Sequence, residues 1–185
     1  NKLSMKKLFF IPALAAMVFL ASCGGDNTAD NTETTTTTTT ETPAPEEAPG
    51  ADIPGINDVA VTDHIEIEGS DDMKFDKTLF KIKAGQDVKL TLKNVGKLPK
   101  ESMAHNVVIL QQGTDVQKFG EAAVADKAND HIPASMKLDV VAHTKLLGPG
   151  ESDTITINIK EPGVYDFICS FPGHFGSMKG KIVVE

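Results

Sequence analysis

The stretch TITINIKEPGVYDFIC, residues 154–169, shows how this chain builds regular structure. Thr154–Ile159 alternates polar and apolar side chains with a period of two, which is typical of a strand with one buried face. The turn signal Glu161-Pro162-Gly163 follows, and Val164–Cys169 is a second strand candidate. Two strand patterns joined by a tight turn predict a sheet rather than a helical fold.

The same pattern occurs elsewhere in the chain. His64–Glu68 and Lys89–Val95 alternate in the same way, and Asn106–Leu110 and Lys181–Val184 are further strand candidates. Several short strands at this spacing predict an all-β fold, an antiparallel Greek-key β-sandwich or barrel of about 120 residues.

One insert has a different composition. Residues 114–129 are rich in Ala, Lys and Glu, and Thr114 or Asp115 can cap the first turn of a helix. We therefore expect one short helix outside the sandwich.

The first part of the chain is typical of an exported protein. Met5-Lys6-Lys7 precedes an apolar run, Leu8–Ala21, which is short for a membrane span. The run ends in Leu20-Ala21-Ser22-Cys23, which resembles a bacterial lipobox. Residues 1–22 are thus expected to be a lipoprotein signal peptide and Cys23 the lipid attachment site, with an ordinary signal peptide as the alternative. The lipobox implies a protein anchored by lipid to a bacterial membrane, in the periplasm or at the cell surface.

Low complexity marks the next segment. It contains an unbroken threonine run, Thr34–Thr40, several prolines and many acids, but almost no large apolar side chains. Such a composition cannot bury enough surface to offset the entropy of ordering. We expect residues 23–61 to be a disordered tether and residues 62–185 to be the folded domain.

Charge and cysteine content narrow the class of protein. The 185-residue chain has a formal net charge of -8, and its 18 basic residues are all lysines. An acidic chain without arginine is a poor binder of nucleic acid, so no such partner is expected. The two cysteines, Cys23 and Cys169, lie in segments of opposite character, which makes a disulfide between them unexpected.

Three soft donors lie together near the end of the chain. Cys169, His174 and Met178 follow one another with the spacing Cys-x4-His-x3-Met, between two strand candidates. A thiolate, an imidazole and a thioether suit copper, and a trigonal copper site needs a second histidine. Four histidines remain: His64, His105, His131 and His143. Of these, His105 directly precedes a strand candidate, where it can reach the same end of a sandwich.

The flanks of these donors resemble a known family. Met103-Ala104-His105-Asn106 and Cys169–Gly180 are similar to the two halves of the copper site of the azurins, which are blue copper electron-transfer proteins of the cupredoxin superfamily. Gly69–Phe75, Leu98–Lys100 and Ala142–Leu146 are also azurin-like and occur in azurin order. The resemblance covers about Thr62 to Glu185. The tether lies outside it, as in the tethered, auracyanin-type members of the family.

This resemblance implies a site and a cofactor. It implies one type 1 copper ion with His105, Cys169 and His174 as trigonal ligands and Met178 as a weak axial ligand. The backbone carbonyl of Ala104 would be the opposite axial contact, at a position where the family usually has glycine. Asn106 resembles the residue that ties the two ligand loops together.

The resemblance also implies a function. A site filled by protein ligands suits a carrier of single electrons rather than an enzyme, and redox proteins such as c-type cytochromes or a terminal reductase are the expected partners. We expect a monomer with an apolar docking surface around the ligand loop, formed by Met73, Leu98, Met103, Phe171, Pro172, Gly173 and Gly176. Two alternatives remain: a copper-binding or copper-delivery protein without a redox role, and an adhesion-type sandwich.

Overall fold

The computed structural model describes residues 47–185. The predicted signal peptide, Cys23 and most of the predicted tether lie outside this part of the chain. Within it, no helix is both long enough and apolar enough to cross a membrane.

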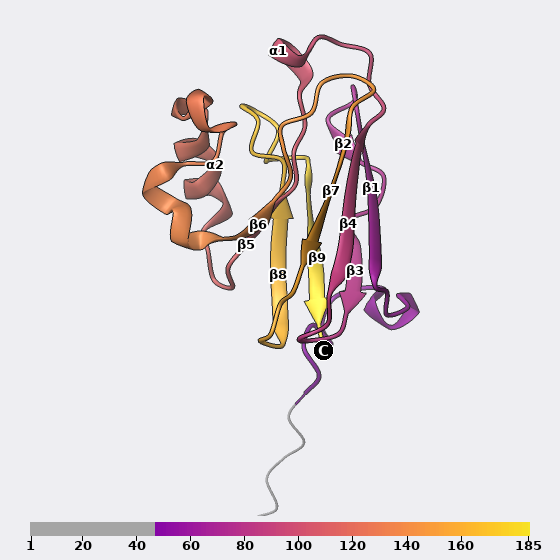
Figure 1. Ribbon diagram of the computed structural model, residues 1–185. Coiled ribbons are helices and arrows are strands. Elements are labelled where there is room, and N and C mark those ends of the chain that lie inside the picture. Colours follow the sequence, from indigo (N-terminus) through magenta and orange to yellow (C-terminus); the bar gives the residue numbers. More distant parts are fainter. Residues whose placement is uncertain (1–46) are drawn as a thin grey trace, which may run out of the picture. The chain divides into compact units, whose positions relative to one another are not determined.

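Two sheets form the described part of the chain, as predicted (Figure 1). One has the strand order β2-β1-β4-β7 and the other the order β3-β9-β8-β5-β6. The strands are β1 (His64–Ser70), β2 (Lys74–Phe75), β3 (Leu79–Ile82), β4 (Val88–Asn94), β5 (Val108–Leu110), β6 (Val140–His143), β7 (Ser152–Ile157), β8 (Gly163–Ile168) and β9 (Lys179–Val184).

Pairing between the strands is mostly antiparallel, but β1 pairs with β4 and β3 with β9 in parallel. The prediction of purely antiparallel sheets is therefore wrong in these two pairs. In both pairs at least one strand of the opposite sheet lies between the partners in sequence, so the chain leaves the sheet and returns to it by crossing over. Such crossovers depend on tertiary packing, which local alternation does not encode.

The opening stretch crosses from one sheet to the other. β7 pairs with β4 in the first sheet, whereas β8 pairs with β5 and β9 in the second. The predicted turn after residue 160 is therefore a connection between layers and not a hairpin. Between the layers lies one main core, whose fully buried members include Ile65, Leu90, Phe167 and Ile182.

The predicted helix is confirmed as α2 (Val116–Ala125). The carboxylate of Asp115 accepts a hydrogen bond from the backbone N–H of Lys118 at 3.0 Å, so Asp115 is the N-cap. α2 covers a second apolar cluster through Phe119, on the outer side of β5 and β8. The shorter helices were not expected: η1 (Ile56–Asp58), α1 (Lys100–Met103), η2 (Lys127–Asn129) and η3 (Ala134–Asp139).

Regular structure begins before the expected boundary at residue 62. Turns start at Pro49, and Ile56 in η1 is only 3% exposed and packs near β3. A β-carbon on Gly50 would lie 3.0 Å from a methyl group of Val183, so this segment runs close over β9. This segment has a few apolar side chains, among them Ile56, and so has apolar surface to bury. The composition of the preceding threonine-rich residues offers almost none.

Candidate metal centre

Cys169 directly follows β8 at one end of the sandwich. Strand alternation turns Tyr165, Phe167 and Cys169 into the main core, so these three side chains share one face. The ring of Phe167 packs between Phe75 and Phe80, with centroid distances of 5.7 and 5.9 Å. This packing fixes the end of the strand, so the thiol of Cys169 is fully buried at a defined place.

The loop from Cys169 to Met178 is closed by its own backbone. The N–H of Cys169 donates to the carbonyl of Met178 at 2.9 Å, and the N–H of Met178 donates to the carbonyl of His174 at 2.8 Å. The loop turns at Gly173, whose φ of +84° lies in the left-handed region. Cys169, His174 and Met178, the three predicted donors, are all buried at this end of the sandwich.

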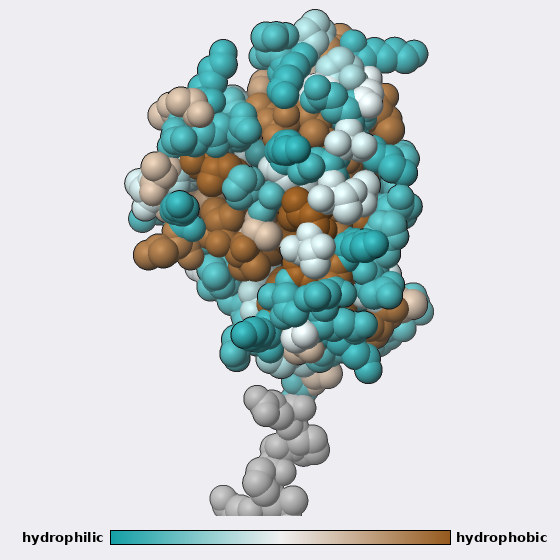
Figure 2. All heavy atoms as spheres, viewed as in Figure 1, coloured by the Kyte–Doolittle hydropathy of each residue, from teal (hydrophilic) through white to brown (hydrophobic). Residues whose placement is uncertain are grey.

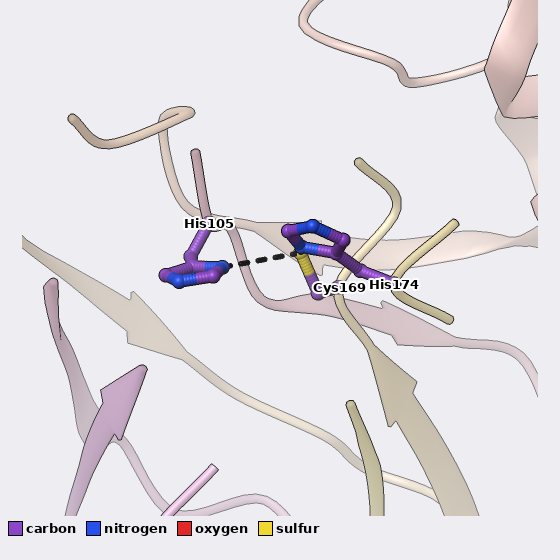
Figure 3. A group of neighbouring side chains, drawn as sticks. All are labelled: His105, Cys169 and His174. Carbon is purple, nitrogen blue, oxygen red and sulfur yellow. Dashed lines mark hydrogen bonds between the residues drawn. The ribbon is translucent and has the colours of Figure 1, made fainter. Parts of the chain in front are cut away.

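His105 reaches the same place from the opposite side of the site (Figure 3). It precedes β5 and is paired with Leu147 through two backbone hydrogen bonds of 3.0 and 2.8 Å. Its Nε2–H donates to the carbonyl of Ser70 at 3.1 Å, which leaves the lone pair of Nδ1 free. Gly69 allows this position, because a β-carbon there would lie 2.9 Å from the imidazole of His105.

The side chains of His105, Cys169 and His174 converge on one point. The Sγ of Cys169 lies 4.0 Å from Nδ1 of His105 and 3.6 Å from Nδ1 of His174. A metal with bonds of about 2.0–2.3 Å in a trigonal plane holds neighbouring ligand atoms about 3.6 Å apart. The three donors are therefore spaced as a single metal ion requires, and all three residues are buried.

Burial sets the protonation of this cluster. Desolvation raises the pKa of the Cys169 thiol to about 12, although backbone hydrogen bonds from Asn106 and Phe171 act in the opposite sense. Desolvation, with a smaller contribution from the nearby His105, lowers the pKa of His174 to about 4. Desolvation also lowers the pKa of His105. Near neutral pH the imidazoles are thus neutral donors, and a metal must displace one proton, that of the thiol.

Asn106 joins the two segments that carry the donors. Its side chain accepts a hydrogen bond from the backbone N–H of Ser170 at 2.9 Å and donates to the Ser170 hydroxyl at 2.9 Å. It also donates to the carbonyl of Asp130 at 3.2 Å. Both neighbours, Ser170 and Asp130, lie outside β5. One buried amide therefore holds together the His105 segment, the Cys169 segment and the α2 insert, by which we mean residues 111–139 between β5 and β6.

Ala104 is fully buried beside the thiol, with its carbonyl oxygen 3.9 Å from Sγ of Cys169. Its φ of -78° and ψ of 153° are extended angles that any residue adopts. Alanine therefore fits here without backbone strain, even though azurins usually have glycine at this position.

His174 is the donor nearest the surface. Its imidazole packs on Phe171, with a centroid distance of 4.8 Å, and the residue is 2% exposed. His105 and Cys169 are 0% exposed, so His174 alone among the three clustered donors keeps a trace of exposed surface.

The predicted docking residues differ in exposure. Met73 and Leu98 are 39% and 44% exposed, and Gly173 and Gly176 are also exposed. Met103 and Pro172 are partly buried, whereas Phe171 is only 9% exposed and lies mostly beneath the surface. The Ser177 hydroxyl donates to the carbonyl of Met73 at 3.0 Å, which ties the β1–β2 turn to the ligand loop.

Three histidines of the described chain lie outside the cluster. His64 and His143 are exposed, but His131 is only 4% exposed. Its ring packs edge-on against Phe171 at 5.3 Å. Sequence inspection missed this contact because residues 131 and 171 meet only in the folded chain.

A β-sandwich with one buried His–Cys–His cluster at its end defines a blue copper electron-transfer protein, and its cofactor is one type 1 copper ion. Comparison with known proteins agrees with this class. The profile of the family described as "Copper binding proteins, plastocyanin/azurin family" matches residues 61–185. The chain belongs to the plastocyanin/azurin family.

Individual relatives are similar over this same domain. An azurin of Alcaligenes faecalis is 38% identical over 122 residues, which cover 64% of this chain and 94% of that protein. The structure of dithionite-reduced auracyanin from Roseiflexus castenholzii matches with 36% identity and a TM-score of 0.61, over 68% of this chain and 99% of that one. Auracyanin A from Chloroflexus aurantiacus, described as a "blue" copper protein, matches with 29% identity and a TM-score of 0.60, over 68% and 100%.

Proposed function

We propose that this protein carries single electrons between redox proteins at a bacterial membrane, with its copper ion held by His105, Cys169 and His174. Met178, fully buried at the end of the ligand loop, would be the weak axial ligand. The observation that carries the proposal is the convergence of the three donors, since Cys169 lies 64 positions from His105 in sequence. Copper bound there would supply the redox couple Cu(II)/Cu(I).

Rigid donors favour electron transfer over catalysis. Backbone bonds hold the ligand loop, and Ser70 and Leu147 hold His105, so the donor positions do not depend on the metal. A site that keeps one geometry needs little rearrangement when an electron arrives or leaves. With four side-chain donors and the Ala104 carbonyl beside the thiol, no position is left for a substrate, so we do not propose an enzyme.

His174 provides the exit for the electron. It is the clustered donor with a trace of exposed surface, and its ring packs on Phe171. We propose that the docking surface around it is formed by Met73, Leu98, Met103, Phe171, Pro172, Gly173 and Gly176. Small apolar surfaces support the weak, short-lived encounters of redox partners. We expect c-type cytochromes or a terminal reductase to dock here with a monomeric carrier.

The described chain begins at the pole opposite to the metal centre (Figure 1). Gly50 lies against Val164, near the start of β8, and Val183, near the end of β9. Cys169 follows the other end of β8, about 20 Å away for six strand residues. A tether anchored through Cys23 would therefore present the docking surface away from its own attachment point, in the periplasm or at the cell surface.

Cu(II) addition to the purified full chain tests the site. We expect an intense blue colour that Cys169→Ser abolishes, because serine cannot supply a thiolate. Cys23→Ser is the matched control, since it removes the other cysteine of the chain. It should keep the colour and release the protein from the membrane fraction. A colourless wild-type mixture would refute the copper assignment, and continued membrane attachment of Cys23→Ser would refute the anchor.

A copper-delivery protein would bind the same ion. Delivery favours open sites that exchange their metal, whereas these donors are buried. Stopped-flow mixing of the Cu(II) form with reduced cytochrome c separates the two functions. Loss of the blue colour on a fast timescale supports an electron carrier, and retention of Cu(II) with each redox partner tried would support delivery.

A further inference from the structure

We propose that the α2 insert positions His174 by holding the two aromatic residues that flank it in the ligand loop. The insert holds Phe175 through Gly120 and Phe171 through His131. We call these two contacts the loop clamp. The proposal rests on the ligand role of His174, and it adds positioning residues that lie outside the set of ligands.

The first contact is between the backbone of α2 and the ring of Phe175. A β-carbon on Gly120 would lie 2.4 Å from the Phe175 ring, so the ring sits directly on the helix. Gly120 does not have a positive φ, and alanine is favoured over glycine within helices. Close approach, and not backbone freedom, is thus the structural use of this glycine. Phe119 and Ile132 belong to the cluster against which Phe175 packs.

The second contact passes from His131 through Phe171 to the ligand. The His131 and Phe171 rings meet edge-on, with a centroid distance of 5.3 Å and an interplanar angle of 72°. Phe171 then packs on His174 at 4.8 Å. The three rings form a continuous row that starts in the α2 insert and ends at a proposed metal ligand.

The backbone at His131 is held in an uncommon conformation. Asp130 and His131 have φ values of +52° and +61°, in the left-handed region that residues with a β-carbon seldom adopt. Two hydrogen bonds fix this pair: Nδ1–H of His131 donates to the carbonyl of Ala123 at 3.0 Å, and Asn106 donates to the carbonyl of Asp130 at 3.2 Å. A strained backbone conformation persists where the surrounding contacts hold it. Here those contacts place the His131 ring on Phe171.

The clamp accounts for the placement of His174 without a metal. The backbone of the ligand loop fixes its fold, but an imidazole near the surface could still rotate. The Phe171 ring packs on the imidazole of His174, and the next residue, Phe175, is anchored on α2. Together these contacts restrict that motion and keep Nδ1 at 3.6 Å from the Cys169 thiol. Groups that orient metal ligands from outside typically change metal affinity by about 10–100-fold when removed.

Three variants test the clamp. His131→Asn keeps a residue that tolerates positive φ but removes the ring, whereas His131→Phe keeps a ring on Phe171. Gly120→Ala forces Phe175 away from the helix. The matched controls are His143→Asn and His143→Phe, at an exposed histidine, and Lys118→Ala, at an exposed position of α2.

Two measurements apply to the full chain: Cu²⁺ affinity by competition with a chelator, and the NMR signals of the His174 ring in the metal-free protein. We expect His131→Asn and Gly120→Ala to lower the affinity by about 10–100-fold and to broaden or shift the His174 ring signals. His131→Phe keeps a ring on Phe171 but loses the hydrogen bond to Ala123, so it should lose less affinity than His131→Asn. All three controls should stay near wild type. The reduction potential of the loaded protein should move with the affinity.

Wild-type affinity and unchanged His174 signals in both His131→Asn and Gly120→Ala would overturn the clamp. An equal loss in His131→Phe and His131→Asn would also overturn it, because the ring contact would then have no part. If the wild-type chain bound no copper, the ligand assignment itself would fail, and the metal-free NMR signals would still decide whether the clamp holds His174.

Discussion

The buried thiol of Cys169 makes metal uptake depend on pH in a specific way. Its pKa is about 12 instead of the ordinary 9.0, because burial disfavours the thiolate. The difference makes a bare thiolate about 4 kcal/mol less favourable than in an exposed cysteine. Since the pKa of His174 is lowered to about 4, the thiol is the proton to be displaced from the cluster at neutral pH.

The magnitude follows from the displacement of one proton per metal ion. Below the pKa of the thiol, apparent affinity rises tenfold per pH unit, or about a thousandfold from about pH 7 to about pH 10. If the thiol had its ordinary pKa of 9.0, the affinity would instead level off near pH 9, before the end of this range. For this protein the apparent affinity should therefore keep rising between about pH 9 and about pH 10.

Chelator competition with Zn²⁺ measures this dependence, because zinc has no redox chemistry with the thiol. Calorimetry in buffers of different ionisation enthalpy counts the protons released, and we expect one per ion at neutral pH. Cys169→Ser removes the titrating group and should flatten the profile. An affinity that levels off near pH 9, or binding without proton release, would refute the assignment of a buried neutral thiol.

Three further predictions concern the metal-free and loaded domain. Asn106→Leu should lower stability by about 1–3 kcal/mol in urea titrations, because the buried N–H of Ser170 loses its acceptor. An unchanged unfolding midpoint would count against a stabilising role of the Asn106–Ser170 hydrogen bond. Metal-free protein should lose stability as pH falls from about 6.5 towards 4, because His174 takes up a proton in the unfolded chain but not in the folded chain, where its pKa is about 4. His174→Phe should weaken this pH dependence in thermal melts. A pH profile identical to that of the wild type would contradict the prediction. Phe167→Ala should cost about 3–5 kcal/mol, because its fully buried ring packs between two other rings; a cost below 1 kcal/mol would mean that the core can refill the space.

Much of the fold could be predicted from local patterns. Alternation over His64–Glu68 and Lys89–Val95 placed β1 and β4, and the Asp115 cap placed the start of α2. The predicted start of β5 at Asn106 is wrong, because the strand begins at Val108. The residues before Val108 bond to the ligand loop and to Leu147 instead of forming a regular ladder. Local patterns also gave no sign of α1, which is a single turn.

Long-range contacts explain what could not be predicted. His131 has only polar neighbours on one side in sequence, yet the fold buries its ring on Phe171. Gly120 looks like a weak point in a helix until Phe175 is seen to lie on it. Both contacts join the α2 insert to a loop about forty or more residues later in the chain, and no local periodicity reports such a pairing. Figure 2 shows hydrophobic residues at the surface among hydrophilic ones. Which apolar residues stay exposed likewise depends on how the sheets and α2 pack, and not on local sequence.

The sequence by itself predicted six of the nine strands in the described residues, the helix α2 and the chemical identity of the donors, because alternation, capping and side-chain softness are properties of neighbouring residues. It did not predict β2, β3 or β6. It also marked the ligand loop, since Cys169, His174 and Met178 lie within ten positions. The resemblance already pointed to His105 as the missing donor, but only the tertiary structure showed that it lies 4.0 Å from the thiol, and in which protonation state. Burial and a hydrogen bond to Ser70 set those properties of His105, and both arise only when distant segments pack together.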